Sequence, residues 1–330
     1  MATVFNTSNA KSQREDLANF ISNIVRDETP FVSSIGKTTS KALLHEWSTD
    51  QLAAPGDNST AEGAGFPGTV TAGPEITRLN NKCQIFTKSI EVSGSIEAVD
   101  KAGRKSEFKY QSEKRGKELM RDIEWAVTTG KAVKSTSGNR KMGGFQSWVP
   151  KANTVDAAGG TLSGGAGDGS NLTATNSANK AAFSLSQVDQ AMQNCYENGG
   201  RPSTLMMSPR VKRLFSAAAQ GQAANGNVRR NIDDSGKLRQ SVEIYETDFG
   251  VVKVIPNYIM GTTGSGAGAA AGQDTNVLVY DASTFKMATL RPLHHRDISE
   301  DGDRLRALMV HETTLECVNP AANGLIMNLA

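Results

Sequence analysis

The sequence predicts an α+β protein organised around one long helix. Apolar residues recur at spacings of three and four through Arg104–Thr129, which indicates a single amphipathic helix. Strand patterns alternate with helix patterns between residues 184 and 260, and period-two strand patterns dominate the chain from residue 276 to its end. A chain of 330 residues is long enough for one large domain or two to three small ones.

The composition indicates a loop-rich chain with a modest core. Hydrophobic residues make up 38% and aromatic residues 6%, while 32 residues are Gly, and chains of this kind often gain stability from neighbouring subunits. The net charge of +2 gives no global field for nucleic-acid binding. The N-terminus lacks the apolar core of a signal peptide, and no apolar run is long enough to span a membrane. Cys83, Cys195 and Cys317 lack metal-site spacing, so we expect buried thiols in a reducing compartment.

The N-terminal part of the sequence is predicted to form a docking helix followed by a long hairpin. Leu17 to Val25 has helical spacing. Lys41–Leu52 and Ile76–Gly94 are the two hairpin arms, separated by a Gly- and Pro-rich stretch from Ala53 to Pro74. The apolar phase of the returning arm changes near Thr87–Ser89, which predicts a bend there. Because a two-stranded ribbon is marginal in water by itself, we expect another copy of the protein to support it.

The helix from Arg104 to Thr129 is expected to be roughly 35–40 Å long and to end before Gly130. Only part of it is apolar, so it is either a strut with subunits or ligands along its flanks or an ordinary amphipathic surface helix. Its Lys and Arg residues are either a solvated face or a non-specific phosphate contact.

The remaining elements follow in order. A Gly/Ser-rich surface insertion covers residues 151–182, and a second Gly/Ala-rich insertion covers residues 261–273. The predicted helices run from about Ser184 to Asn198 and onward from Ser208-Pro209. A hairpin is predicted over Val242–Met260, and further strands are predicted at Leu205–Met207, Asn276–Asp281, Lys286–Leu293, Arg304–Asn319 and Leu325–Leu329.

No catalytic, cofactor-binding or metal-binding motif emerges. The segment His294–Asp301 reads HHRDISED, but it lacks the Asn of a kinase catalytic loop and a third ligand at metal-site spacing. We interpret it as a salt-bridged turn. His45 and His311 are expected to be structural, and no Gly-rich stretch carries the Lys-Ser/Thr of a phosphate loop.

Three stretches carry a family resemblance. TPFVSSIGK (Thr29–Lys37), HEWSTDQLAAP (His45–Pro55) and the run from Glu91 to Glu124 resemble the major capsid proteins of tailed bacteriophages, which have the Hong Kong 97 phage-type fold. The resemblance spans most of the chain, and the two Gly-rich insertions depart from it. No Lys, Asn and Glu trio matches the isopeptide cross-link of one member, so the resemblance does not imply cross-linking here.

The resemblance implies a division of the chain. Residues 1–35 are an N-terminal arm, residues 36–90 are the extended hairpin called the E-loop, and the helix at about 104–129 is the spine helix. The remaining parts are a peripheral domain of residues 91–150 and 301–330, the surface insertion of residues 151–182, and an axial domain of residues 183–300.

The resemblance also implies a function without enzymatic activity. The chain is expected to self-assemble into hexamers and pentamers of an icosahedral virion capsid around a dsDNA genome, in the cytoplasm of a bacterial host. Scaffolding and portal proteins are expected partners, no cofactor or membrane is involved, and a decoration protein is left open. Candidate assembly anchors are Trp47, Leu52 and Phe66, and candidate lumen residues facing DNA are Lys109, Lys114 and Arg115.

Two alternatives remain open at this point. One is an encapsulin-like nanocompartment with the same fold and a protein cargo. The other is a monomeric binding domain, or an enzyme that uses His294 and His295. Nucleic acid that copurifies with shells would separate the first alternative from a capsid, and a sizing column would identify the second.

Overall fold

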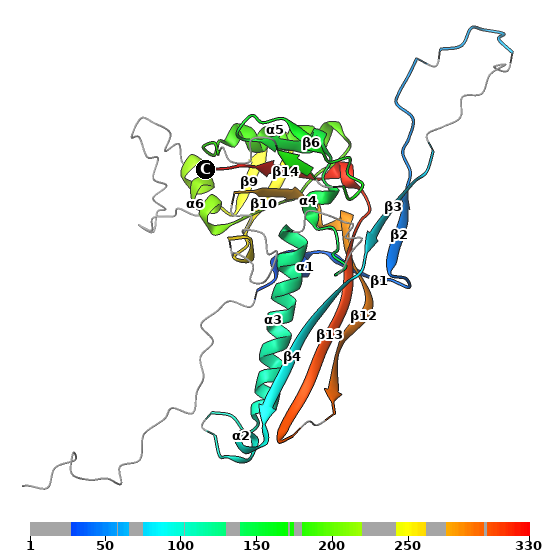
Figure 1. Cartoon of the computed structure of the whole chain (residues 1–330). Helices are drawn as coiled ribbons and strands as arrows, with labels where there is room; N and C mark the ends of the chain where they lie inside the picture. Colours follow the sequence, from blue (N-terminus) through cyan, green and yellow to red (C-terminus); the bar gives the residue numbers. More distant parts are fainter. Residues whose placement is uncertain are drawn as a thin grey trace, which may run out of the picture.

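A 23-residue helix and two 14-residue strands run side by side through the elongated half of the molecule (Figure 1). The helix is α3 (Glu107–Thr129), and it lies along β4 (Gln84–Ser93). The computed structural model describes residues 28–57, 59–65, 75–101, 103–129, 139–170, 172–174, 180–219, 242–261, 275–299 and 302–330.

The sheet beside α3 has the strand order β1-β12-β13-β4. The strand β13 (Arg304–Cys317) is antiparallel to both of its neighbours, β12 (Phe285–Ile298) and β4, whereas β1 (Gly36–Thr39) runs parallel to β12. Phe86, Ile90 and Val92 of β4 are buried, while the alternate residues of β4 are exposed. This period-two pattern places one face of the sheet on the helix and leaves the other face outside.

The other half of the molecule is a lobe around a six-stranded sheet with the order β5-β14-β11-β8-β10-β9. Its central strands β8 (Thr204–Met207) and β11 (Val277–Tyr280) are buried at every residue. The helices α5 (Leu185–Glu197) and α6 (Pro209–Ala219) pack on one face of the sheet. The other strands are β5 (Thr154–Asp156), β9 (Ile244–Thr247), β10 (Gly250–Pro256) and β14 (Gly324–Met327).

The opposite face of the lobe sheet joins the elongated half through an aromatic core. The rings of Phe31, Phe145, Tyr280 and Phe285 have centroids 5.0 to 6.3 Å apart. Phe31 belongs to α1 (Pro30–Ser34) and Phe145 to α4 (Phe145–Trp148). Since these residues share one hydrophobic cluster with Leu119 and Ile123 of α3, the two halves share a core.

A two-stranded ribbon leaves the junction of the two halves (Figure 1). It consists of β2 (Leu44–Thr49) and β3 (Thr77–Lys82), which pair antiparallel from Leu44 opposite Lys82 to Thr49 opposite Thr77. Beyond the ribbon, residues 50–57, 59–65 and 75–76 are exposed and extend away from the body. Smaller elements are α2 (Gly94–Ala98), β6 (Leu162–Gly164) and β7 (Leu172–Ala174).

Several predicted bounds differ from the structure. The long helix begins at Glu107 rather than Arg104. The predicted bend at Thr87–Ser89 lies earlier, at Cys83, where β3 ends and β4 begins. The predicted turn at His294–Asp301 was wrong over its first five residues, because β12 continues to Ile298 along the ladder that β13 offers. Residues 300 and 301, the predicted helix at residues 17–25 and the second Gly/Ala-rich insertion lie outside the described residues.

The predicted domain bounds also need correction. β12 falls in the range predicted for the axial domain but pairs in the sheet beside α3, while β14 falls in the predicted peripheral range but pairs in the lobe. The residues at 151–182 are not only a surface insertion, since Val155, Leu162 and Leu172 are buried. The paired ribbon of residues 44–82 is shorter than the predicted hairpin of residues 36–90.

Candidate assembly surfaces

The ribbon is fixed to its own subunit at its base. The side chain of Asn81 is fully buried, and its Nδ2 donates to the carbonyl oxygens of Leu315 and Gly143 at 2.7 and 3.2 Å. Its Oδ1 accepts from the backbone N–H of Gly143 at 2.9 Å. His45 Nε2 lies 2.9 Å from a carboxylate oxygen of Glu316, as expected for a structural histidine. A polar side chain with all its groups satisfied fixes the position of a strand inside a core.

Trp47 also contacts its own subunit. Its indole Nε1 donates to the carbonyl oxygen of Cys317 at 2.8 Å, and its ring lies 5.1 Å from the ring of Trp148. Trp47 stays a predicted anchor on a neighbouring copy, and only the part of its side chain that these contacts leave exposed could serve that role. The half-buried indole stabilises the base of the ribbon, because its polar atom and much of its apolar surface already have partners within the chain.

The far end of the ribbon is bare. Leu52 is 97% exposed and Ile76 is 67% exposed. No helix or strand is formed by the described residues from Asp50 to Glu75. Phe66, the third predicted anchor, lies outside the described residues. The apolar side chains of Leu52 and Ile76 are therefore accessible for a contact with another molecule.

The three basic residues predicted to face DNA do not share one face of α3. With about 100° between successive helical residues, Lys109, Lys114 and Arg115 are spread around more than half of the helix circumference. Lys109 and Lys114 are exposed and have no ion-pair partner among the described residues. Arg115 pairs with Glu118, with Nη1 2.6 Å from a carboxylate oxygen. A continuous basic strip along the helix is therefore not formed by these residues.

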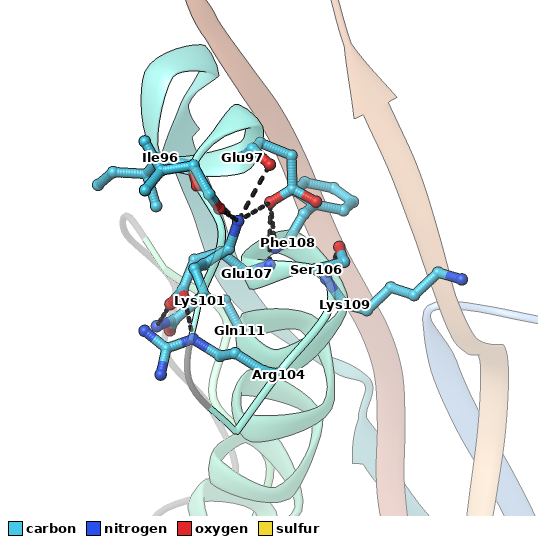
Figure 2. A network of polar contacts seen from close by, with 10 residues as sticks. Ile96, Glu97, Lys101, Arg104, Ser106, Glu107, Phe108, Lys109 and Gln111 are labelled. Atoms are coloured by element: carbon cyan, nitrogen blue, oxygen red, sulfur yellow. Dashed lines mark hydrogen bonds and ion pairs between the residues drawn. The ribbon is translucent and has the colours of Figure 1, made fainter. Parts of the chain in front are cut away.

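A reciprocal pair of caps holds the far end of α3 (Figure 2). The carboxylate of Glu97, in α2, accepts from the backbone N–H groups of Glu107 and Phe108 at 2.9 and 3.3 Å. In return, Lys101 Nζ donates to the carbonyl oxygens of Ile96, Glu97 and Val99 at 2.6 to 3.1 Å. Each charged side chain thus satisfies the free backbone groups at a helix end. The hydroxyl of Ser106, followed by the backbone N–H groups, lowers the pKa of Glu97.

Glu124, near the other end of α3, joins three parts of the chain. Its fully buried carboxylate accepts from Phe31 N at 2.9 Å, from Val32 N at 2.8 Å and from Asn257 Nδ2 at 2.7 Å. Burial raises the pKa of Glu124 above its ordinary value, although the three donors act in the opposite direction. This carboxylate holds α1, the long helix and the end of β10 in one arrangement.

Sequence reasoning missed Glu97, Lys101 and Glu124. Glu124 had a local signal, because it stands between Ile123 and the pair Ala126-Val127 on a helix whose C-terminal half is apolar. A carboxylate in such a position becomes buried when the apolar side of the helix packs on the core. A buried carboxylate needs hydrogen-bond donors.

The described residues hold no arrangement typical of enzyme chemistry. No group of three or more His, Cys, Asp or Glu residues in this part of the chain could hold a metal ion. His294 and His295 lie in the exposed half of β12, where His295 Nε2 is 3.4 Å from Asp297. All three cysteines are buried, and burial raises the pKa of Cys195 to about 12. None of the described helices is long and apolar enough to cross a membrane.

Comparisons with known proteins agree with this geometry. Residues 1–330 match the model of the family described as SU10 major capsid protein. The major capsid protein of Escherichia phage Phieco32 is 23% identical over 359 aligned residues, which cover 99% of this chain and 97% of that protein.

Solved structures share the fold. The capsid of cyanophage A-1(L) has a TM-score of 0.64 at 12% identity, with 98% of each chain covered. The capsid of a native GTA particle has a TM-score of 0.63 at 13% identity, again with 98% of each chain covered. A holo-SrpI encapsulin complex from Synechococcus elongatus has a TM-score of 0.55 at 9% identity, covering 99% of this chain and 96% of that one.

Proposed function

This chain belongs to the SU10 major capsid protein family, and from that premise we propose how its described surfaces build a shell. It is the major capsid protein of a phage, with the Hong Kong 97 phage-type fold, and it assembles into a multi-subunit shell as a structural component of the virion. The proposal concerns the finer steps of that assembly.

We propose that the projecting ribbon lies over a neighbouring subunit and stabilises rings of five and six that close into an icosahedral shell. The bare end of the ribbon, with Leu52 almost fully exposed, is the observation that carries this proposal. In such an assembly, one surface of each copy contacts a different surface of the next copy. Contacts of this kind generate a ring when the rotation between neighbouring copies closes. Leu52 and Ile76 are the described side chains that such a contact would cover.

Shortening the ribbon tests this proposal. Residues 53–74 are replaced by a short turn, which leaves the pairing from Thr49 opposite Thr77 and the buried base intact. We expect a soluble, folded subunit that forms no stable shells in sedimentation and electron microscopy. Intact shells from the shortened chain would remove the assembly role of the ribbon. A full-length control with Leu52→Ser and Ile76→Ser should form shells of lower thermal stability.

The proposed shell encloses a dsDNA genome and assembles in the cytoplasm of a bacterial host with scaffolding and portal proteins. We propose that Lys109 and Lys114, whose ammonium groups are exposed, contact packaged DNA without sequence preference. Arg115 contributes less, because Glu118 already neutralises it. Shells of Lys109→Gln/Lys114→Gln that retain DNA as strongly as the wild type at raised salt would argue against this contact.

An encapsulin-like compartment is the weaker alternative. The likeness to an encapsulin extends to the fold at 9% identity, whereas the family match is to capsid proteins over the whole chain.

A further inference from the structure

Glu124 connects three parts of the fold through the two oxygens of one carboxylate. Its Oε1 accepts from Phe31 N of α1 at 2.9 Å and from Asn257 Nδ2 of the lobe at 2.7 Å. Its Oε2 accepts from Val32 N at 2.8 Å. One oxygen is therefore shared between α1 and the lobe. Because a hydrogen bond is lost when it lengthens by roughly 0.7 Å, these bonds limit how far the three parts can shift against one another.

Asn257 moves with the sheet of the lobe. It follows directly after β10, and its backbone N–H donates to the carbonyl oxygen of Met207 in the central strand β8 at 2.8 Å. Its Oδ1 accepts from the backbone N–H of Ile259 at 2.9 Å, and the whole residue is buried. The side chain that reaches Glu124 is therefore held in place by the lobe itself.

The other two donors move with the elongated half. Phe31 and Val32 belong to α1, and Ile35 alone separates α1 from β1. The strand β1 pairs with β12 in the sheet beside α3, from Gly36 opposite Lys286 onward. The carboxylate therefore joins the lobe to an edge strand of the elongated sheet as well as to the long helix.

The two halves also meet through the aromatic core. The rings of Phe31, Tyr280 and Phe285 pack against one another, and the hydroxyls of Ser34 and Tyr280 lie 3.2 Å apart. Apolar packing is non-directional, so it holds the halves together without fixing their angle closely. Burial raises the pKa of Glu124, which means that its charge is less well stabilised here than in water. Such a buried charge adds little net stability but can select one arrangement of the parts around it.

A small change at Glu124 is magnified along α3. The lobe lies beyond the end of α3 that carries Glu124, and the other end of the helix is far from the lobe (Figure 1). The helix from Glu107 to Glu124 is about 26 Å long. A tilt of about 5° between the lobe and α3 would displace the far end of the helix by about 2 Å. In a shell closed by repeated contacts, a displacement of this size changes the angle between neighbouring copies.

We propose that Glu124 is a positioning residue for assembly, which sets the angle between the lobe and the elongated half and thereby the curvature of the shell. This rests on the proposed closed shell and names a residue that determines its size. The hydrogen bond to Asn257 is the step on which the proposal depends, because it reaches from α3 into the lobe.

Distances between the two halves test the angle in the unassembled full chain. Spin labels are attached through Lys109→Cys on α3 and Arg213→Cys in the lobe, both at exposed positions, while the three natural cysteines are buried. Glu124→Ala removes the acceptor, and Asn257→Leu removes the donor on the lobe but leaves both bonds to α1. We expect both variants to shift or broaden the distribution of label distances. The matched control Val188→Ala truncates a fully buried side chain of the lobe core and should leave the distribution unchanged.

Shell size tests the consequence of the angle. The same variants without labels are assembled and measured by electron microscopy. We expect Glu124→Ala and Asn257→Leu to give shells whose mean diameter is shifted, or whose diameters vary more than those of the wild type. Val188→Ala should give shells of wild-type diameter.

Each outcome decides the proposal. An unchanged distribution of label distances in Asn257→Leu would overturn it, even if that variant formed no shells. Shells of wild-type diameter from a variant with a shifted distribution would overturn it too, because the angle would then not set the curvature. An equal effect of Val188→Ala would assign the change to lost stability and would also overturn it. Loss of shells together with a shifted distribution supports it when Val188→Ala still assembles.

A failure of the proposed function would be recognised separately. If the wild-type chain formed no closed shells, the proposed shell would be refuted, whereas the label distances would still show whether Glu124 sets the angle.

Discussion

Removal of the carboxylate of Glu124 should loosen the junction between α1, α3 and the lobe. In Glu124→Ala three buried donors, Phe31 N, Val32 N and Asn257 Nδ2, lose their acceptor. A buried donor without a partner costs about 1–3 kcal/mol. Burial of the charge is itself unfavourable, as the raised pKa of Glu124 indicates, and this offsets part of the loss. We expect the free energy of unfolding to fall by about 2–4 kcal/mol.

Glu124→Gln separates the charge from the shape. Its single oxygen can accept from Phe31 N and Asn257 Nδ2, but its amide NH₂ then faces the N–H of Val32, at a cost of about 1–3 kcal/mol. Because the folded pKa lies above the ordinary value of 4.5, the stability linked to this carboxyl is present at low pH and is lost as the pH rises through the folded pKa. The difference between wild type and Glu124→Gln should therefore be larger at pH 5 than at pH 8.

Urea unfolding of unassembled subunits, followed by tryptophan fluorescence, measures both effects. The matched control is Glu113→Gln, an exposed residue of the same helix whose carboxylate lies 3.9 Å from Lys117. This control should stay within about 0.5 kcal/mol of the wild type. The reasoning fails if Glu124→Ala is as stable as the control, or if the penalty of Glu124→Gln grows with pH.

Four further predictions concern the ribbon base, the far end of the long helix and the thiol of Cys195. Trp47→Ala should lower the free energy of unfolding by about 2–3 kcal/mol and speed proteolysis of the ribbon, because it removes a hydrogen bond and an aromatic contact; unchanged proteolysis would contradict this. Asn81→Leu should cost about 3 kcal/mol in the same unfolding assay, since it leaves buried backbone groups unpaired. Lys101→Met should cost about 1 kcal/mol through loss of the carbonyl cap, measured as a lower melting temperature. The thiol of Cys195 should stay unreactive to a thiol reagent at pH 8 until the chain is unfolded, because its pKa is raised to about 12 and it is buried.

The sequence was most informative where short-range patterns decide the structure. The helix that follows Ser184 could be predicted because its cap and its apolar stripe lie within one segment. The hairpin of β9 and β10 could be predicted for the same reason. Strand partners could not be predicted in this way. The segment His294–Ile298 lacks the alternation of a strand, yet it continues β12 because β13 supplies a ladder of hydrogen bonds.

The candidate surface residues differ in the same way, because some depend on their own segment and others on residues far away in the sequence. The exposure of Leu52 follows from a Gly- and Pro-rich stretch that offers it no neighbour along the chain. The burial of Trp47 depends on Trp148 and Cys317, which are more than a hundred residues away, so the sequence supplied no reason to place it at the base. An aromatic residue at an expected interface therefore predicts burial but not which chain covers it.

The base of the ribbon packs on its own subunit, whereas its far end is exposed. This difference explains how the ribbon can stay formed in a subunit that has not yet assembled. A two-stranded ribbon is marginal alone, but here Asn81, Trp47 and Leu79 hold it to the core of its own subunit. The base therefore keeps the ribbon paired in the single subunit, and the contact proposed above would have to fix only the exposed residues beyond Thr49 and Thr77. This reduces the conformational entropy lost at each contact. Variants of the base should slow assembly by disordering the ribbon, whereas variants of those exposed residues should weaken the finished contact and leave the subunit stable.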